Sequence, residues 1–421
     1  MYFKKNIKFK NNKLFLVTIL FFISIISRVP VVLIYSDAYI QNEWGPLVNN
    51  LINNNTLSLI EFDGFLLPNL LMPPLYAYYL FIFSFLDLEL KNFLLVVFFS
   101  QTFLSAIAVI IFYKINKFFF NDKVSFYSSI LFSLFPIYLY SCSQISSASL
   151  TIFLALLFYY FFFKIRFKRK LKYIILLSLV SGMLILLRRE FIGIVILSNF
   201  YLFFLCKLKV KDFIIIFLIT LITISPYLIR NYIIFDKMII SSGLGYNLWK
   251  ANNPKSKVEG FQNYAINKKL KSKINEIPKD KFYRINENLI FLNEAIKNIK
   301  SDYERYILLY IKRFFYYFFI DLESTYPNYF NKLHYIPVLI ISITSFFGIL
   351  IYNKKSLNMN YLLLILFFYI TTFAFFAILP RYKIYILPFQ IIFTNILISY
   401  LIDKFYKKRA STSYYFQHKD F

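Results

Sequence analysis

The chain has 421 residues, of which 59% are hydrophobic, including 54 Phe and 36 Tyr. Apolar runs long enough to cross a bilayer follow one another along it, which excludes a soluble globular protein and predicts an all-α polytopic membrane protein. The formal net charge of +27 would indicate nucleic acid as the partner of a soluble protein, but here the cations stand at the ends of apolar runs, so they indicate membrane orientation and no nucleic-acid partner.

Ten of the apolar runs predict transmembrane helices. The first follows a charged start typical of a signal peptide, but it lacks a small-residue cleavage site, so we predict an uncleaved span. An eleventh run, 70–86, is short and opens with PNLLMPPLY; we predict that it lies on or dips into the outer face. The ten predicted spans are 15–35, 92–113, 124–140, 147–163, 173–187, 191–206, 212–229, 334–352, 359–379 and 384–402.

Charge bias sets the predicted orientation. With these spans the N-terminus lies inside, and the short inner segments hold most of the cations near span ends, including the run KIRFKRKLK at 164–172. This distribution follows the positive-inside rule. A spanning 70–86 segment would place that run outside. The cations left in the short outer segments are Lys91, Arg188, Arg189, Arg381 and Lys383.

The long segment after the seventh span divides the chain. We predict an N-terminal transmembrane module at 1–230 with a first outer loop at 36–91, an extracytoplasmic loop region at 231–333, and a C-terminal transmembrane module with a cytoplasmic tail at 334–421. Within the loop region, apolar residues at helical spacing predict at least one amphipathic helix that rests on the membrane or on the bundle. These residues are Leu289, Leu292, Ile296, Ile299, Tyr303 and Tyr306.

Polar residues that could take part in catalysis or binding gather on the predicted outer face. The first loop, YSDAYIQNEWGPLVNNL, carries two carboxylates, and the other stretches are LLRREFIG, SPYLIRNYIIFDK, SSGLGYNLWKANNP and FAFFAILPRYKIYILPFQIIF. The candidate residues in these stretches are Asp37, Glu43, Arg188, Arg230, Trp249, Asn252, Asn253, Arg381 and Lys383.

These residue types suit a lipid-linked anionic substrate with a polar head such as a sugar. The planar fork of Arg binds phosphate oxygens bidentately. A hydroxyl nucleophile needs a carboxylate base. Structural alternatives remain for each residue: Arg381 can snorkel to the interface, Trp249 can belong to an interfacial aromatic belt, and Asn252 and Asn253 can form a turn before Pro254.

In their order along the chain, several stretches resemble a known family. SRVP followed by SDAYIQNEW, then PPLYAYYLFIF, LLRREF, SPYLIRNY, GYNLWKANNP and RYKIYILPFQ resemble the bacterial branch of the membrane glycosyltransferases of the C superfold, relatives of family 39 and of the protein mannosyltransferases. The chain departs from the family pattern at two places. Arg188-Arg189 stands where relatives often have Arg-Pro, and YSCSQISSASL lacks the glutamate that relatives often carry between the third and fourth spans, with Gln144 as the nearest polar substitute.

The resemblance implies a reaction. Members take sugars from polyprenyl-phosphate carriers and invert the anomeric centre with the acidic residue of the first outer loop, which by position is Asp37. We therefore expect an inverting glycosyltransferase in the inner (plasma) membrane, facing the periplasm or exterior, with a glycan, lipid or protein as acceptor and the carrier lipid between spans. Asp37 is the expected base and Glu43 the second candidate; the outer cations would stabilise the departing phosphate. No metal ligands are predicted and no cofactor is required, although some relatives use a divalent metal.

Two other functions stay open. A flippase or transporter of lipid-linked sugars would place charges near the bilayer midplane and often shows duplicated halves, and the sequence has neither feature. A polymerase or ligase that joins glycans on carrier lipids shares the chemistry and differs mainly in the size of its donor.

Overall fold

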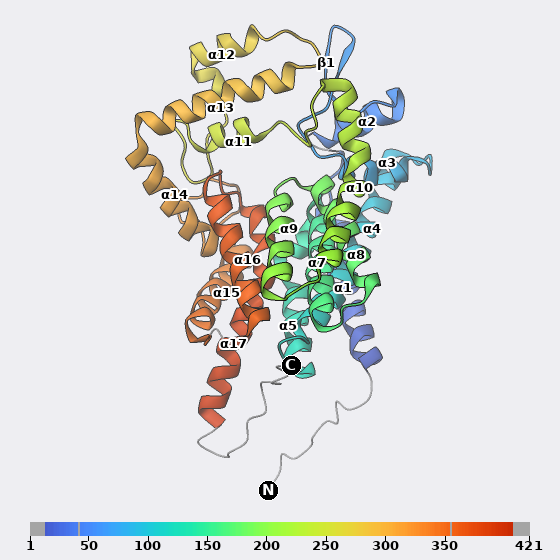
Figure 1. Ribbon diagram of the computed structural model, residues 1–421, viewed down its shortest axis with the longest axis vertical. Coiled ribbons are helices and arrows are strands. Elements are labelled where there is room, and N and C mark those ends of the chain that lie inside the picture. Colours follow the sequence, from blue (N-terminus) through green and yellow to red (C-terminus); the bar gives the residue numbers. More distant parts are fainter. Residues whose placement is uncertain (1–12, 41–42, 354–355, 407–421) are drawn as a thin grey trace.

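A computed structural model describes residues 13–40, 43–353 and 356–406 of the chain. It has a helical bundle and, at one end, a smaller domain of helices and one hairpin (Figure 1). Helix α1 begins and helix α17 ends at the opposite end of the bundle (Figure 1). We call the end that carries the smaller domain the upper end, as drawn. The predicted cytoplasmic tail after residue 406 and the first twelve residues lie outside the described part.

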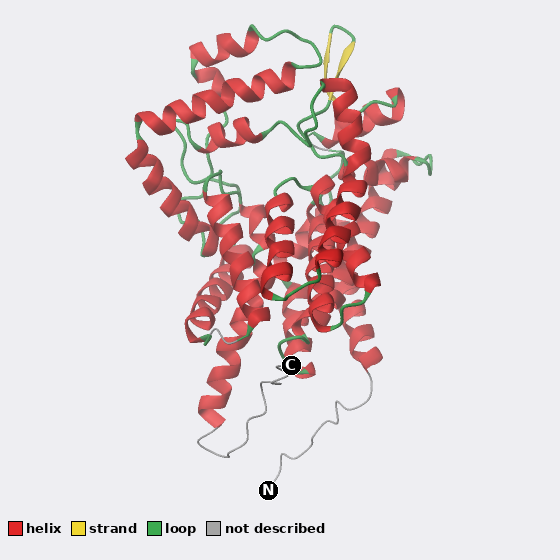
Figure 2. Cartoon of the chain, in the orientation of Figure 1, coloured by secondary structure: helices red, strands yellow, loops and turns green. Residues whose placement is uncertain are grey.

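Helices make up most of the described chain, and the only strands assigned in that part are two short ones (Figure 2). The elements are α1 (Lys13–Tyr35), α2 (Trp44–Asn54), β1 (Ser58–Phe62), β2 (Phe65–Pro68), α3 (Leu75–Ser84), α4 (Leu90–Asn116), α5 (Asp122–Leu134), α6 (Pro136–Ser141), α7 (Ala148–Phe167), α8 (Leu171–Leu187), α9 (Phe191–Phe200), the π-helical turn η1 (Tyr201–Leu205), α10 (Val210–Phe235), α11 (Leu244–Ala251), the 3₁₀ turn η2 (Tyr264–Ile266), α12 (Lys268–Asn275), α13 (Tyr283–Ser301), α14 (Tyr303–Phe318), α15 (Lys332–Ile351), α16 (Leu357–Ala374), the 3₁₀ turn η3 (Pro380–Tyr385) and α17 (Leu387–Tyr406).

Six of the described helices are long and apolar enough to cross a membrane: α1, α4, α7, α10, α15 and α16. The other four predicted spans fall on α5 with α6, on α8, on α9 with η1, and on α17. A multi-pass bundle is therefore confirmed, and the count of ten crossings stays a prediction. Helix α3, in the ambiguous 70–86 run, has ten residues and rises about 15 Å, half of a bilayer's hydrocarbon thickness.

The predicted span at 124–140 is not one continuous helix. It breaks at Phe135, which is extended at φ −68° and ψ 123° because the following Pro136 disfavours helical backbone before it. Pro136 then occupies the first position of α6, where its missing N–H costs nothing. The break turns the chain at the upper end of the bundle, just before the segment that contacts the first loop.

The fold class also differs from the all-α prediction by one hairpin. Strands β1 and β2 pair antiparallel around Asp63 and Gly64, whose φ angles are +47° and +81°. Two consecutive positive φ angles are what a tight type I′ hairpin turn needs, and Asp-Gly is a preferred pair for it.

Helices from both ends of the sequence share one core. The hydroxyls of Tyr159 on α7 and Tyr369 on α16 lie 3.1 Å apart, and Ser198 on α9 meets Tyr361 on α16 at 2.7 Å. The close approach of α15 to α17 requires Gly348, since a Cβ there would lie 1.9 Å from the Phe393 carbonyl oxygen. The two predicted transmembrane modules thus pack as one bundle.

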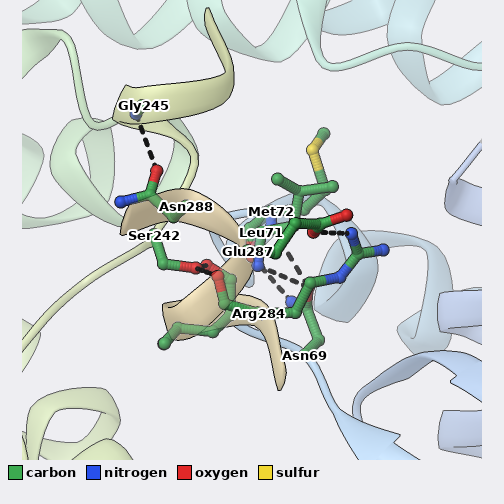
Figure 3. A network of polar contacts seen from close by, with 9 residues as sticks. Asn69, Leu71, Met72, Ser242, Gly245, Arg284, Glu287 and Asn288 are labelled. Atoms are coloured by element: carbon green, nitrogen blue, oxygen red, sulfur yellow. Dashed lines mark hydrogen bonds and ion pairs between the residues drawn. The ribbon is translucent and has the colours of Figure 1, made fainter. Parts of the chain in front are cut away.

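The upper domain has a separate core and a polar junction with the bundle. Trp249 of α11 packs with Phe291 of α13, 5.0 Å between ring centroids, beside Leu270 and Ile274 of α12. Gly245 lets α11 approach α13, because a Cβ there would lie 2.1 Å from the Asn288 carbonyl oxygen. The junction (Figure 3) consists of Asn69, whose side chain bonds Leu71 and Met72, and of the pairs Ser242 with Arg284, Gly245 with Asn288 and Arg284 with Glu287.

Candidate active site

Asp37 follows α1 directly and is fixed against the segment after α6. Its backbone N–H donates to the Ser143 carbonyl at 3.0 Å, and its Oδ2 accepts from the Ile145 N–H at 2.7 Å. Burial raises the pKa of Asp37 above its usual value, and the Ile145 N–H acts in the opposite direction. The carboxylate is therefore positioned and half-buried.

The region around Asp37 is polar. The Gln144 side chain donates to the Tyr35 carbonyl at 3.0 Å, so this residue, at the position where relatives often have a glutamate, lies beside the end of α1. Tyr76 of α3 donates its hydroxyl hydrogen to Gln101 at 3.1 Å and also interacts electrostatically with Asp37. The ring of Tyr76 also contacts Trp44, with 4.7 Å between centroids. Trp44 adjoins Glu43, so Tyr76 links the surroundings of the two first-loop carboxylates.

Glu43 faces cations from two other parts of the chain. It precedes α2, and its charge acts on Arg188 in the α8–α9 link and on Lys250 in α11. Burial and the nearby Arg381 lower the pKa of Lys250, whereas Glu43 raises it. Glu43, Arg188, Lys250 and Arg381 therefore form an electrostatically coupled group drawn from four segments.

Two arginines of this group retain hydrogen-bonding capacity. Arg188 pairs with Glu190, Nη1 to Oε1 at 3.6 Å, and its buried Nε has no hydrogen-bond partner among the described residues. Arg381 is exposed in η3; its guanidinium carbon lies 5.8 Å from the Tyr382 ring, and its N–H groups make no hydrogen bond with the described residues. Guanidinium groups with unused N–H donors suit a phosphate.

A contact at the upper end joins the Asp37 side to the Arg381 side. Tyr138 of α6 donates its hydroxyl hydrogen to the carbonyl of Ile384 in η3 at 2.8 Å. Asp37 is bonded to residues that follow α6, and Arg381 lies three residues before Ile384. The base candidate and the phosphate candidates thus belong to one end of the bundle.

Lys383 does not share this environment. Its side chain is 6% exposed and its Nζ lies within hydrogen-bonding distance of the carbonyls of Tyr317, Phe318 and Phe319 and of the Ser342 hydroxyl. An ammonium group has three N–H donors, so these acceptors use all of them. Lys383 stabilises the C-terminal end of α14, where helical carbonyls lack internal partners.

Arg230 is likewise engaged within the protein. It donates to the Asn69 carbonyl at 3.0 Å and to Asn231 Oδ1 at 2.7 Å, and its guanidinium lies over the rings of Tyr227 and Phe235. It connects α10 to the polar junction below the upper domain.

Trp249, Asn252 and Asn253 are buried, with 3%, 6% and 4% of their surfaces exposed. Trp249 lies in the core of the upper domain. Asn252 accepts from Arg313 at 3.2 Å, and Asn253 donates to the Phe261 carbonyl at 2.8 Å. These contacts are structural, and they leave Lys250, between Trp249 and the two asparagines, as the side chain of this stretch that reaches the coupled group.

Sequence reasoning missed Lys250 and Arg313. Lys250 lies inside the GYNLWKANNP stretch, but one lysine in a lysine-rich chain carries little signal. Arg313 is completely buried and donates to the carbonyls of Ala251, Lys257 and Val258 as well as to Asn252. Only its partners, far away in sequence, reveal its role. Among the described residues no cluster of three or more His, Cys, Asp or Glu could hold a metal ion.

Residues 72–229 match the family described as dolichyl-phosphate-mannose-protein mannosyltransferase. The chain also superposes on the archaeal oligosaccharyltransferase AglB from Archaeoglobus fulgidus, in complex with an inhibitory peptide and a dolichol-phosphate, with a TM-score of 0.56 and 16% identity. The chain has the fold of the membrane glycosyltransferases of the C superfold. This confirms the resemblance seen in the sequence.

The AglB superposition covers 95% of this chain and 52% of the archaeal protein, so the chain spans about half the length of that relative. A second structure of the A. fulgidus enzyme, tethered with an acceptor peptide, gives a TM-score of 0.55 at 15% identity, covering 94% and 50% of the two chains. ArnT from Cupriavidus metallidurans, bound to undecaprenyl phosphate, gives a TM-score of 0.41 at 9% identity, covering 91% of this chain and 76% of ArnT. No curated protein sequence matches the chain significantly.

Proposed function

We propose that the protein is an inverting glycosyltransferase that moves a sugar from a polyprenyl-phosphate carrier to an acceptor hydroxyl at the upper end of the bundle. The observation that carries this proposal is the coupled group itself: the first-loop carboxylate of Glu43 lies near cations of the α8–α9 link and of α11, and the α11 cation, Lys250, also lies near Arg381 of η3. The fold supports the class of reaction, and the archaeal relative with this fold was solved with a dolichol-phosphate.

In this proposal Asp37 removes the proton of the acceptor hydroxyl while that oxygen attacks the sugar C1. The bond between C1 and the carrier phosphate breaks on the opposite side, and its electron pair leaves with the phosphate oxygen. Arg381, Arg188 and Lys250 stabilise the resulting charge. Glu43 orients the cations through its own charge. Lys383, Arg230, Trp249, Asn252 and Asn253 act indirectly, by supporting the segments that hold the site.

Transfer and flipping predict different products. Protein purified into lipid nanodiscs and given a radiolabelled polyprenyl-phosphate sugar together with the parent cell's envelope glycans and lipids should release carrier phosphate and move the label to an acceptor. Movement of intact lipid between the leaflets of proteoliposomes, without release of carrier phosphate, would instead establish a flippase.

Arg381 provides the residue-level arm of this test. Arg381→Ala should lower transfer about 100-fold, since the loss of one positioned donor to developing charge typically costs that much. Arg381→Lys keeps the charge without the bidentate fork, so its rate of transfer should lie between those of the wild type and Arg381→Ala. Arg169→Ala, at the opposite end of the bundle, is the control and should transfer normally. Wild-type rates in Arg381→Ala at subsaturating donor would show that Arg381 only anchors at the interface.

A further inference from the structure

Helix α14 carries an apolar face that no described residue covers. Tyr303, Ile307, Leu308, Ile311 and Phe315 follow helical spacing, and each is between 45% and 68% exposed. A contiguous exposed apolar face on a helix is costly in water and marks a surface that contacts another molecule or a membrane.

Aromatic side chains elsewhere on α14 contact the last turns of the candidate membrane span α16. The ring of Tyr310 contacts that of Phe375, with 4.7 Å between centroids and the planes tilted by 51°, at the end of the candidate span α16. Further down, Tyr317 packs against Phe373 and Phe314 approaches Phe367. The lower half of α14 therefore lies beside the last turns of a candidate membrane span, and a crossing by α16 would place the exposed side chains of Ile311 and Phe315 at hydrocarbon depth.

A basic groove lies beside this face, around the level where the span ends. It has a volume of about 250 Å³ and is lined by Lys257, Arg305, Lys312, Glu323, Leu308 and Leu309, among others. Three cations against one carboxylate give it a net positive charge. The neighbouring Tyr310 contacts Phe375 at the end of α16, so a crossing by α16 would place the groove near the lipid headgroups.

The cations of the groove keep capacity for an anion. Lys257 is exposed, and its ammonium group makes no hydrogen bond or ion pair with the described residues; its backbone carbonyl accepts from Arg313. Arg305 uses two of its five N–H groups, on the carbonyls of Asn253 and Ser256. Lys312 is paired with Glu323, but this pair is half-exposed and can exchange for a phosphate oxygen.

We propose that this groove binds the phosphate of an anionic phospholipid from the adjoining leaflet, with the acyl chains lying along Ile311 and Phe315. Charge complementarity selects the headgroup and the exposed apolar stripe selects a lipid over a soluble anion. The site is separate from the donor phosphate site proposed at Arg381, and it requires no transferase activity, so the two proposals can fail independently.

Native mass spectrometry of the purified full chain tests this site. Protein titrated with phosphatidylglycerol or phosphatidylcholine should bind one phosphatidylglycerol at least about tenfold more tightly, because a basic side chain at the membrane surface favours anionic lipid. Lys257→Gln/Lys312→Gln should abolish that preference. The matched control, Lys271→Gln/Lys273→Gln, removes two exposed lysines of α12 in the upper domain and should keep it.

A further measurement separates a lipid from its headgroup. Glycerol phosphate at millimolar concentration should not displace the bound lipid. Phe315→Ser should weaken the binding of both phosphatidylglycerol and phosphatidylcholine. Equal binding of the two lipids by the wild type, an unchanged preference in Lys257→Gln/Lys312→Gln, or the same loss in the α12 control would each overturn the proposal. Lys257→Gln alone, which leaves the Lys312–Glu323 pair intact, should lose part of the preference for phosphatidylglycerol. It still tests the site if the double variant misfolds.

Discussion

Asp37 and Glu43 lie six residues apart in the first loop, but their surroundings differ. Asp37 is fixed by the backbone of Ser143 and Ile145, whereas Glu43 is coupled to the cations that we assign to phosphate. A general base should be held in place and should not be neutralised by the groups that bind the leaving phosphate. This difference favours Asp37 as the base.

Replacing Asp37 tests that assignment. Asp37→Asn keeps the shape of the side chain and can still accept from the Ile145 N–H, but it cannot take a proton. Transfer should fall by about 10²–10⁴-fold, the usual worth of general base catalysis, while carrier-lipid binding persists. Asp63→Asn, an exposed position in the hairpin turn of the same loop, is the matched control and should transfer normally.

The pH profile gives a second readout for Asp37. Because burial raises its pKa, the protonated, inactive form persists to higher pH than for a free aspartate. The rate of transfer should therefore fall as the pH drops, with a midpoint above the ordinary value of about 4. A well-folded Asp37→Asn protein with near-normal rates of transfer would rule out Asp37 as the base and make Glu43 the next candidate.

At the scale of elements, the loop between α11 and η2 depends on α14. Arg313, buried in α14, bonds four acceptors in residues 251–258, so the shape of this loop follows from one side chain over 50 positions away. Lys250, which precedes the loop, takes its position in the candidate site from the same support.

Arg313→Met should loosen this loop. It removes several hydrogen bonds from a charged donor and leaves their acceptors buried, which costs about 3 kcal/mol locally. Amides of residues 251–262 should then exchange hydrogen about 100-fold faster, because each 1.4 kcal/mol is a factor of ten. Lys300→Met, on the exposed surface of α13, should leave exchange unchanged. Unchanged protection in Arg313→Met would show that packing alone holds the loop.

The local chain chemistry of two elements was readable from the sequence. Asp63-Gly64 between apolar residues is a hairpin signal, and Pro136 predicts an extended residue before it. Pro136 lies inside the apolar run 124–140, which we predicted to be one continuous span. The amphipathic helix predicted in the loop region exists as two helices, α13 and α14, which meet at Asp302, where φ is −153°.

At the scale of the whole molecule, the orientation in the membrane rests on charge bias. In a chain with Cys142 and Cys206 replaced by serine, a cysteine at Lys271 in the upper domain should react with a membrane-impermeant thiol reagent applied to intact cells. A cysteine at Lys168, between α7 and α8, should not react. Both positions are exposed in the fold, so accessibility of the side chain is matched. Labelling at Lys168 but not at Lys271 would show that the orientation is the reverse of the one proposed.

The sequence by itself determined the membrane class, the helical runs and the gathering of polar residues at span ends, because hydrophobicity over about 20 residues and charge at its flanks are local properties. It also carried the resemblance to the superfold. Only the tertiary structure decided which polar side chains remain available. Lys383 and Arg381 are two residues apart. The Lys383 ammonium is hydrogen-bonded to carbonyls at the end of α14, whereas Arg381 is exposed. The partners that make this difference lie more than 60 residues away, and no local pattern records them.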